Sequence, residues 1–254
     1  MSATVSAILR YPVKGLSAER LNQAVLERGE GLAHDRRFAL AHGSTGFDPD
    51  RPTWLPKTQF LTLMRDERLA QLRVAFDPDE GILVLRRQGK QVVRADVGSS
   101  LGRTLVGQFF AQFMAGASRG MPRLVEAPGH MFSDSRHKYL SMVNLASVRD
   151  LERVVRRPVD ALRFRANLLV DGLPAWAEQH WPGRSLKLGP AAVTVADTIE
   201  RCAATNVDPE TAERDLNIPL QLQRGFGHVT LGVYLRVEQP GRLRVGDQVV
   251  ALDG

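Results

Sequence analysis

Residues 197–209 read Asp-Thr-Ile-Glu-Arg-Cys-Ala-Ala-Thr-Asn-Val-Asp-Pro and hold the only cysteine of the 254-residue chain, Cys202. The preceding residues 191–196 are small and β-branched, which favours a strand. After the cysteine, Asp208-Pro209 indicates a turn, because proline disfavours the α region for the residue before it. The sequence therefore predicts that Cys202 lies where a strand runs into an irregular loop.

The flanks of Cys202 bear on its chemistry. A lone cysteine is more often a small buried hydrophobe than a reactive group. A core cysteine usually lies inside an apolar run, whereas Glu200, Arg201, Thr205 and Asn206 bracket this one. A neighbouring guanidinium such as that of Arg201 favours the thiolate, the form that attacks electrophiles and binds metals. The residues alone leave both readings of Cys202 open.

Length and composition bound the protein class. The 254 residues suffice for one large or two small domains, and 43% hydrophobic with 24% charged residues is ordinary for a soluble globular protein. No apolar run approaches the length of a membrane span, and the N-terminus lacks the pattern of an export signal. One cysteine excludes an internal disulfide framework and cysteine-rich zinc sites. We expect a cytoplasmic protein with no membrane segment.

The net charge of +6 raises the question of a nucleic-acid partner. The arginines are scattered, without a basic run of five or the motif of a nucleic-acid module. Aromatic residues make up only 6%, which is few for base-stacking platforms. We therefore expect no nucleic acid, and instead a few cationic side chains that converge on a small anionic ligand.

Short alternating segments dominate the chain. Residues 5–11 alternate between apolar and polar as a half-buried strand does, and so do residues 229–237. Residues 162–172 also predict a strand. Two helices are expected, one from Ser100 and one over residues 147–156. In the first helix the apolar stripe steps by four residues and predicts core packing; it consists of Leu101, Leu105, Phe109 and Phe113.

A small and flexible segment, residues 115–120, is the best candidate for an internal boundary. The sequence thus predicts a domain over residues 1–115 and a second over residues 116–254. Strands outnumber helices in both, so the predicted fold class is mainly β with few helices.

The cysteine loop and three motifs elsewhere in the chain resemble those of a known family. Residues 200–211 (Glu-Arg-Cys-Ala-Ala-Thr-Asn-Val-Asp-Pro-Glu-Thr) are similar to the cysteine segment of MOSC-domain proteins, in particular the mitochondrial amidoxime-reducing component and its bacterial relatives. The first strand leads into Tyr11-Pro12-Val13-Lys14, and Asp35-Arg36 precedes another strand, as in the family's N-terminal β-barrel domain. Further on, residues 164–167 (Phe-Arg-Ala-Asn) resemble the family's Phe-Arg-Pro-Asn.

The resemblance implies roles for these residues. Cys202 would be the catalytic residue and the protein ligand to molybdenum. The cofactor-binding residues would be Lys14, Arg36, Arg165, Asn167 and Arg201. Taken alone, Lys14 and Arg36 would each be a solvated surface charge. Two departures are visible, since Gly15 stands where relatives commonly have serine and Ala166 stands where they have proline.

The family fold implied is two barrel-like units, an N-terminal MOSC β-barrel domain and a MOSC domain. The function implied is that of an oxidoreductase that binds the molybdenum cofactor (molybdopterin) and reduces N-hydroxylated small molecules. A four-cysteine iron–sulfur cluster cannot form with one cysteine, so electrons would come from a separate electron-transfer protein. The alternative is a sulfur-carrier MOSC protein, in which Cys202 holds a persulfide for transfer to a metal–sulfur cofactor pathway.

Overall fold

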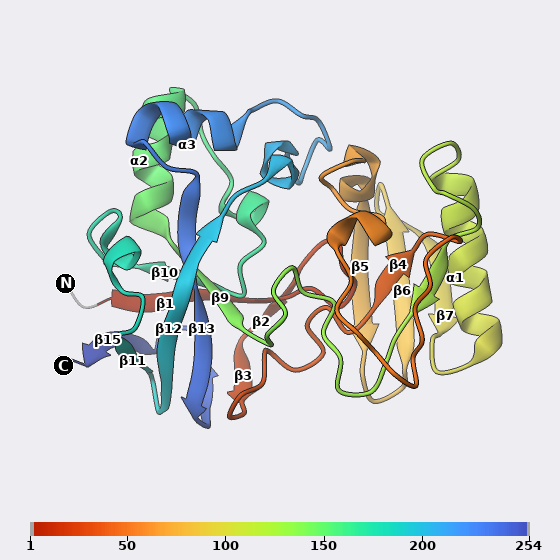
Figure 1. The fold of residues 1–254 in the computed structure, drawn as a ribbon, viewed down its shortest axis with the longest axis horizontal. Helices are drawn as coiled ribbons and strands as arrows, with labels where there is room; N and C mark the ends of the chain where they lie inside the picture. The colour runs from red at the N-terminus through yellow and green to blue at the C-terminus, as the bar shows by residue number, and fades with distance from the viewer. Residues whose placement is uncertain (1–2, 253–254) are drawn as a thin grey trace.

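The computed structural model describes residues 3–252 and is mainly β (Figure 1). Within these residues it has fifteen strands and three α-helices. A barrel with helices α2 (Leu145–Val155) and α3 (Ile218–Phe226) lies beside a smaller group of strands covered by α1 (Ser100–Phe113). No helix in this part of the chain is long and apolar enough to cross a membrane.

Seven strands close the barrel. Their order is β10-β9-β13-β12-β11-β15-β1, and pairing of β1 with β10, for example Ile8 with Leu168, completes the ring. Alternate residues of each strand point inward and are apolar, so the barrel is filled by its own core. The strands are β1 (Ala3–Arg10), β9 (Leu140–Asn144), β10 (Leu168–Asp171), β11 (Ser185–Leu188), β12 (Ala191–Glu200), β13 (Thr230–Gln239) and β15 (Gln248–Leu252).

The other strands form small sheets. β5 (Leu72–Asp77), β6 (Ile82–Arg87) and β7 (Lys90–Asp96) form a three-stranded meander, and β4 (Ala39–Ala41) pairs with β8 (Arg123–Val125). The remaining strands are β2 (Glu19–Leu21), which pairs with β1, and β3 (Gln23–Leu26), which pairs with β14 (Gly241–Arg244). Short 3₁₀ helices are η1 (Lys57–Gln59), η2 (Glu67–Gln71), η3 (Ala161–Phe164), η4 (Ala177–His180) and η5 (Ala203–Asn206).

The predicted fold class is confirmed as mainly β, but the predicted second barrel is not confirmed. In residues 3–252 one barrel closes, and the meander and the β4–β8 pair stay separate sheets. Strand pairings also cross the predicted domain boundary, because β1 completes the barrel of the C-terminal strands and β8 pairs back onto β4. The division into residues 1–115 and 116–254 stays a prediction.

The core face of α1 differs from the predicted stripe. Leu101 is 69% exposed and Leu105 is 46% exposed, so that part of the prediction is wrong. The buried face carries Gly102, Val106, Gly107 and Phe110. A Cβ at Gly102 would lie 1.7 Å from the carbonyl oxygen of Asp96. The helix therefore packs through its glycines against backbone, which a pattern of apolar side chains cannot show.

Residues 162–172 also differ from the predicted single strand. Strand β10 covers only Leu168–Asp171, and η3 with a left-handed residue at Arg165 (φ 53°) precedes it. The chain therefore turns sharply at Arg165 before it enters the barrel. This turn brings the Arg165 side chain to the junction between the barrel and the N-terminal strands.

Candidate functional site

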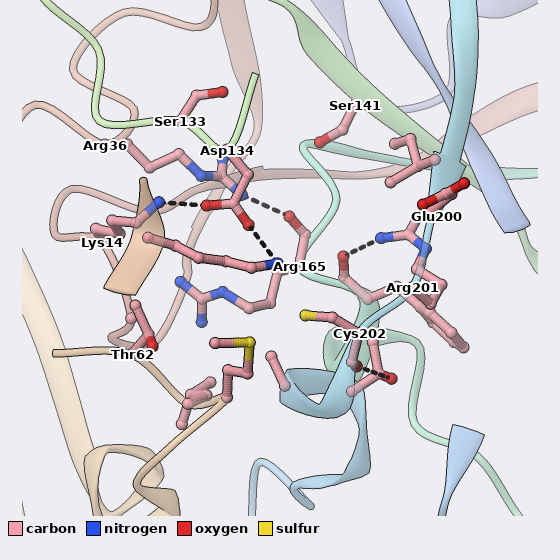
Figure 2. Close-up of a pocket in the computed structure, with 18 of the residues that line it drawn as sticks. Lys14, Arg36, Thr62, Ser133, Asp134, Ser141, Arg165, Glu200, Arg201 and Cys202 are labelled. Atoms are coloured by element: carbon pink, nitrogen blue, oxygen red, sulfur yellow. Dashed lines mark hydrogen bonds and ion pairs between the residues drawn. The ribbon is translucent and has the colours of Figure 1, made fainter. Parts of the chain in front are cut away.

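A pocket of about 200 Å³ lies between the barrel and the N-terminal strands (Figure 2). All six residues predicted for the site line it, although they come from segments far apart in the chain. They are Lys14, Arg36, Arg165, Asn167, Arg201 and Cys202. The structure therefore brings together the cysteine loop and the basic motifs, while the role of each residue stays a prediction.

Cys202 lies where it was predicted, after strand β12 and at the start of η5. Its carbonyl oxygen accepts hydrogen bonds from the N–H of Thr205 over 3.0 Å and from the Thr205 hydroxyl over 2.8 Å. These bonds fix the backbone of the loop. The half-buried thiol points into the pocket (Figure 2). The sulfur is accessible to a ligand in the pocket, so Cys202 is not a core residue.

Lys14 is 7% exposed, so its reading as a solvated surface charge is wrong. Its backbone N–H donates to the carbonyl oxygen of Phe38 over 2.8 Å, which anchors the loop after β1. Its ammonium group donates to the carbonyl oxygen of Phe132 over 3.0 Å and pairs with the carboxylate of Asp134. Burial lowers the pKa of Lys14, and the nearby Asp134 charge opposes that shift.

Gly15 holds the Lys14 loop in a conformation that serine does not adopt readily. Its φ is +87°, and a Cβ there would lie 3.0 Å from the carbonyl oxygen of Leu61. A side chain at this position would strain the backbone and crowd Leu61. The backbone of this loop therefore favours glycine over the serine that relatives commonly have at this position.

Arg36 and Arg165 contact each other across the junction. Both have left-handed backbones, with φ of 47° and 53°. Arg36 pairs with Asp35, and its Nη2 donates to the carbonyl oxygen of Arg165 over 2.7 Å. Arg165 donates from Nη1 to the carbonyl oxygen of Leu16 over 2.7 Å. Burial lowers the pKa of Arg165 to about 10, so both guanidinium groups stay charged near neutral pH.

Asn167 and Arg201 brace the wall of the pocket. Asn167 accepts at Oδ1 from the Ser141 hydroxyl over 2.9 Å and donates from Nδ2 to the carbonyl oxygen of Leu9 over 3.1 Å. Arg201 donates from Nε to the carbonyl oxygen of Leu231 over 2.6 Å and from Nη1 to that of Phe164 over 2.9 Å. Both side chains tie neighbouring elements together, and much of their donor capacity is used on the protein.

Four charged residues of the pocket lining were absent from the predicted site, namely Lys57, Asp134, Arg163 and Glu200, and the first two form an ion pair. Lys57 begins η1, and its ammonium group lies 3.8 Å from Oδ2 of Asp134. Burial lowers the pKa of Lys57, but the charges of Cys202 and Asp134 outweigh this and raise it. Burial raises the pKa of Asp134, and Lys14 and Lys57 outweigh that and lower it. Lys57 lies in a single short 3₁₀ turn and Asp134 in a loop, so no periodic pattern in the sequence marked either residue.

The chemistry of the pocket suits an anionic sulfur-bearing metal cofactor. One thiol shares the pocket with several cations, and the thiolate of a cysteine is a soft metal ligand that suits a sulfur-rich centre. Two buried polar atoms of the lining, Oγ1 of Thr62 and Nε of Arg163, have no hydrogen-bond partner among residues 3–252. Buried polar groups normally have partners. These donors are therefore available to acceptor oxygens of a ligand.

Two sequence profiles match the chain in series. The MOSC N-terminal beta barrel domain matches residues 2–115, and the MOSC domain matches residues 128–250. The second match contains Arg165, Asn167 and Cys202, and the first contains Lys14 and Arg36. The pocket thus draws its residues from both matched regions.

Curated relatives agree with these profiles. Mitochondrial amidoxime-reducing component 1 of Mus musculus is 31% identical over 98% of this chain and 82% of its own length. The Homo sapiens protein of that name is 23% identical over 98% of this chain and 83% of its own length. Molybdenum cofactor sulfurase of Caenorhabditis elegans is 25% identical over 92% of this chain, but the match covers only 33% of that longer protein. The chain therefore belongs to the MOSC-domain family, and its relatives include amidoxime-reducing components.

Proposed function

We propose that this protein binds the molybdenum cofactor in the pocket and reduces N-hydroxylated small molecules. One observation carries the proposal: the only thiol, Cys202, shares a pocket with Lys14, Arg36 and Arg165, which come from other parts of the chain. The names of its relatives, which include amidoxime-reducing components, support the same chemistry.

The side chains would divide the binding between them. Cys202 would offer its thiolate as the one protein ligand to the metal. Lys14, Arg36 and Arg165 would hold the anionic phosphate end by charge-assisted hydrogen bonds, with arginine offering a bidentate geometry. The Thr62 hydroxyl, which has no hydrogen-bond partner among residues 3–252, would donate to the same ligand. When bound, the cofactor supplies the two-electron redox chemistry, and the protein orients it.

The reaction would convert an N-hydroxyl group and two electrons plus two protons into an N–H group and water. These 254 residues hold one thiol, which is assigned to the metal, so they cannot also ligate a four-cysteine iron–sulfur cluster. The electrons would come from a separate electron-transfer protein. The charged Lys57 ammonium group lies in the pocket with Cys202 and could donate a hydrogen bond to the substrate oxygen. We also propose a cytoplasmic location.

An activity assay tests the proposal. Cofactor-loaded protein would receive reduced viologen and a benzamidoxime-type substrate, and amidine formation would be followed by chromatography. We expect turnover by the wild type and none by Cys202→Ser. Thr104→Ser, an equally small change at an exposed position of α1, should keep full activity. A loaded and reduced wild type that leaves every N-hydroxylated substrate unchanged would contradict the reductase.

A sulfur carrier is the second candidate. The match to molybdenum cofactor sulfurase and the accessible thiol favour it. In that role Cys202 would hold a persulfide and pass its outer sulfur to an acceptor thiolate. Mass spectrometry of the intact, metal-free protein would then show the added mass of one sulfur atom on Cys202. The basic cluster favours the reductase, because a persulfide carrier needs no site for a phosphate group.

A further inference from the structure

The ring of Tyr11 lies against two of the cations in the site. Tyr11 follows β1 directly and is 1% exposed. The guanidinium carbon of Arg36 lies 4.7 Å from the ring centre, and that of Arg165 lies 4.4 Å from it. Both distances fall inside the limit of roughly 6 Å for attraction between a cation and an aromatic face. One neutral ring thus contacts both guanidinium groups.

The backbone of Tyr11 is tied into the same cluster. Its N–H donates to Oδ1 of Asp35 over 2.7 Å, and its carbonyl oxygen accepts from the N–H of Arg36 over 2.6 Å. Asp35 in turn pairs with the Arg36 side chain. The position of the ring and the position of Arg36 are therefore fixed by the same set of bonds.

Arg36 and Arg165 carry like charges and are 129 residues apart in the chain. Burial lowers the pKa of Arg165 most, and the charge of Arg36 lowers it further. Two such charges stay close only where other groups offset their repulsion. The ring of Tyr11 and the carbonyl oxygens described above do this in the protein, and an anion bound by both arginines would do so more strongly.

The hydroxyl group of Tyr11 contributes little to this arrangement. It is buried and has no hydrogen-bond partner among residues 3–252. Burial raises the pKa of Tyr11 to about 12, against the opposing charges of Arg165 and Arg36. The phenol therefore stays neutral near neutral pH, and its aromatic face is the part that acts on the arginines.

We propose that Tyr11 is a positioning residue whose ring sets the spacing and direction of the Arg36 and Arg165 guanidinium groups, so that both reach one phosphate group. The role of Tyr11 rests on the proposed function in one respect, namely that the phosphate group belongs to the cofactor. Its test can therefore use inorganic phosphate and needs neither molybdenum nor activity.

Three variants separate the ring from the rest of the side chain. Tyr11→Phe keeps the ring and removes the hydroxyl, and Tyr11→Leu removes the ring. Phe110→Leu is the matched control, because Phe110 is equally buried and belongs to the α1 core away from the pocket. Each full-length protein would be purified without cofactor. Its dissociation constant for inorganic phosphate would be measured from the rise in Tm against chloride at matched ionic strength.

We expect Tyr11→Phe to bind phosphate as the wild type does, and Tyr11→Leu to bind about tenfold more weakly, as the loss of two cation–ring contacts implies. Phe110→Leu should lose stability but keep its phosphate affinity. Equal phosphate affinity of Tyr11→Leu and the wild type would overturn the proposal, and so would a wild type that binds no phosphate. Phosphate binding without any molybdenum uptake would instead count against the proposed function alone.

Nuclear magnetic resonance of the wild type and Tyr11→Phe tests the proposal even if Tyr11→Leu does not fold. The ring current of Tyr11 should shift the side-chain N–H resonances of Arg36 and Arg165 upfield, and Tyr11→Phe should keep that shift. Phosphate should then move both resonances together along one titration curve. Resonances at unshifted positions, or a response from only one arginine, would overturn the proposal.

Discussion

The carboxylate of Asp134 pairs with the ammonium group of Lys14 inside the pocket (Figure 2). Lys57 lies 3.8 Å from the same carboxylate. Asp134 thus supplies an internal negative charge at the place where an anionic ligand is proposed to bind. A phosphate group that used Lys14 would have to displace this carboxylate or tolerate its repulsion.

Replacement of Asp134 by asparagine should therefore strengthen anion binding. Its side chain is 48% exposed, so the gain is expected to be modest, about 0.5–1 kcal/mol or roughly two- to fivefold in the dissociation constant. Calorimetric titration of the cofactor-free protein with inorganic phosphate measures it. Asp79→Asn removes the same charge from an exposed turn and should change the affinity less. Weaker phosphate binding by Asp134→Asn would show that the carboxylate assists the site.

The same ion pair should make stability depend on acid pH. The pKa of Asp134 lies below its ordinary value of 3.8 because Lys14 and Lys57 outweigh the effect of burial. A lowered carboxyl pKa stabilises the folded state above the unfolded pKa, and this contribution is lost as the pH falls through the folded pKa. Urea unfolding should show the wild type more stable than Asp134→Asn at about pH 7, by under ~1 kcal/mol, and the difference should shrink as the pH falls below 3.8. A difference that grows in acid would contradict this assignment.

Introduction of the family's serine at Gly15 should destabilise this protein. The φ of +87° is costly for a residue with a Cβ, and that Cβ would lie 3.0 Å from the carbonyl oxygen of Leu61. We expect Gly15→Ser to lower the free energy of unfolding by about 1–3 kcal/mol. Gly116→Ser shares the positive φ but has open space around its Cβ, so it should cost less. Equal losses in denaturant titrations would show that the contact with Leu61 has no effect.

Arg201 should behave as a structural residue at the edge of the site. Its guanidinium group donates to the carbonyl oxygens of Leu231 and Phe164, which lose their partner in Arg201→Gln. We expect a loss of about 2–4 kcal/mol in the free energy of unfolding. Arg236→Gln, at an exposed ion pair, should leave the free energy of unfolding nearly unchanged. Unchanged stability together with lost cofactor would instead make Arg201 a direct ligand group.

Some parts of the candidate site could be predicted from the sequence and others could not. The loop position of Cys202 followed from its β-branched approach and the turn at Asp208-Pro209, because both signals are local. That Lys14, Arg36 and Arg165 line one pocket with Cys202 depends on long-range packing, and only the family resemblance predicted this arrangement. Nothing local marked Lys57 or Asp134, since each acquires its role from a partner distant in the chain.

For the fold, too, local features could be predicted from the sequence and long-range pairings could not. Alternating segments predicted most barrel strands, because each has one face in the core. Closure of the barrel by β1 and β10 could not be predicted in this way, since strand pairing carries no short-range signature. The α1 stripe failed because the helix buries Gly102 and Gly107 against backbone, where close approach rather than side-chain hydrophobicity decides the face.

Metal analysis tests the central claim most directly. The protein would be purified from a host that makes the molybdenum cofactor, and molybdenum per chain would be measured by mass spectrometry of the elements. We predict close to one equivalent in the wild type and in Thr104→Ser, and below about a tenth of that in Cys202→Ser, because the Cys202 thiolate is proposed as the protein's single ligand to the metal. Metal-free wild type, from a host in which a control molybdenum enzyme is fully loaded, would contradict the account.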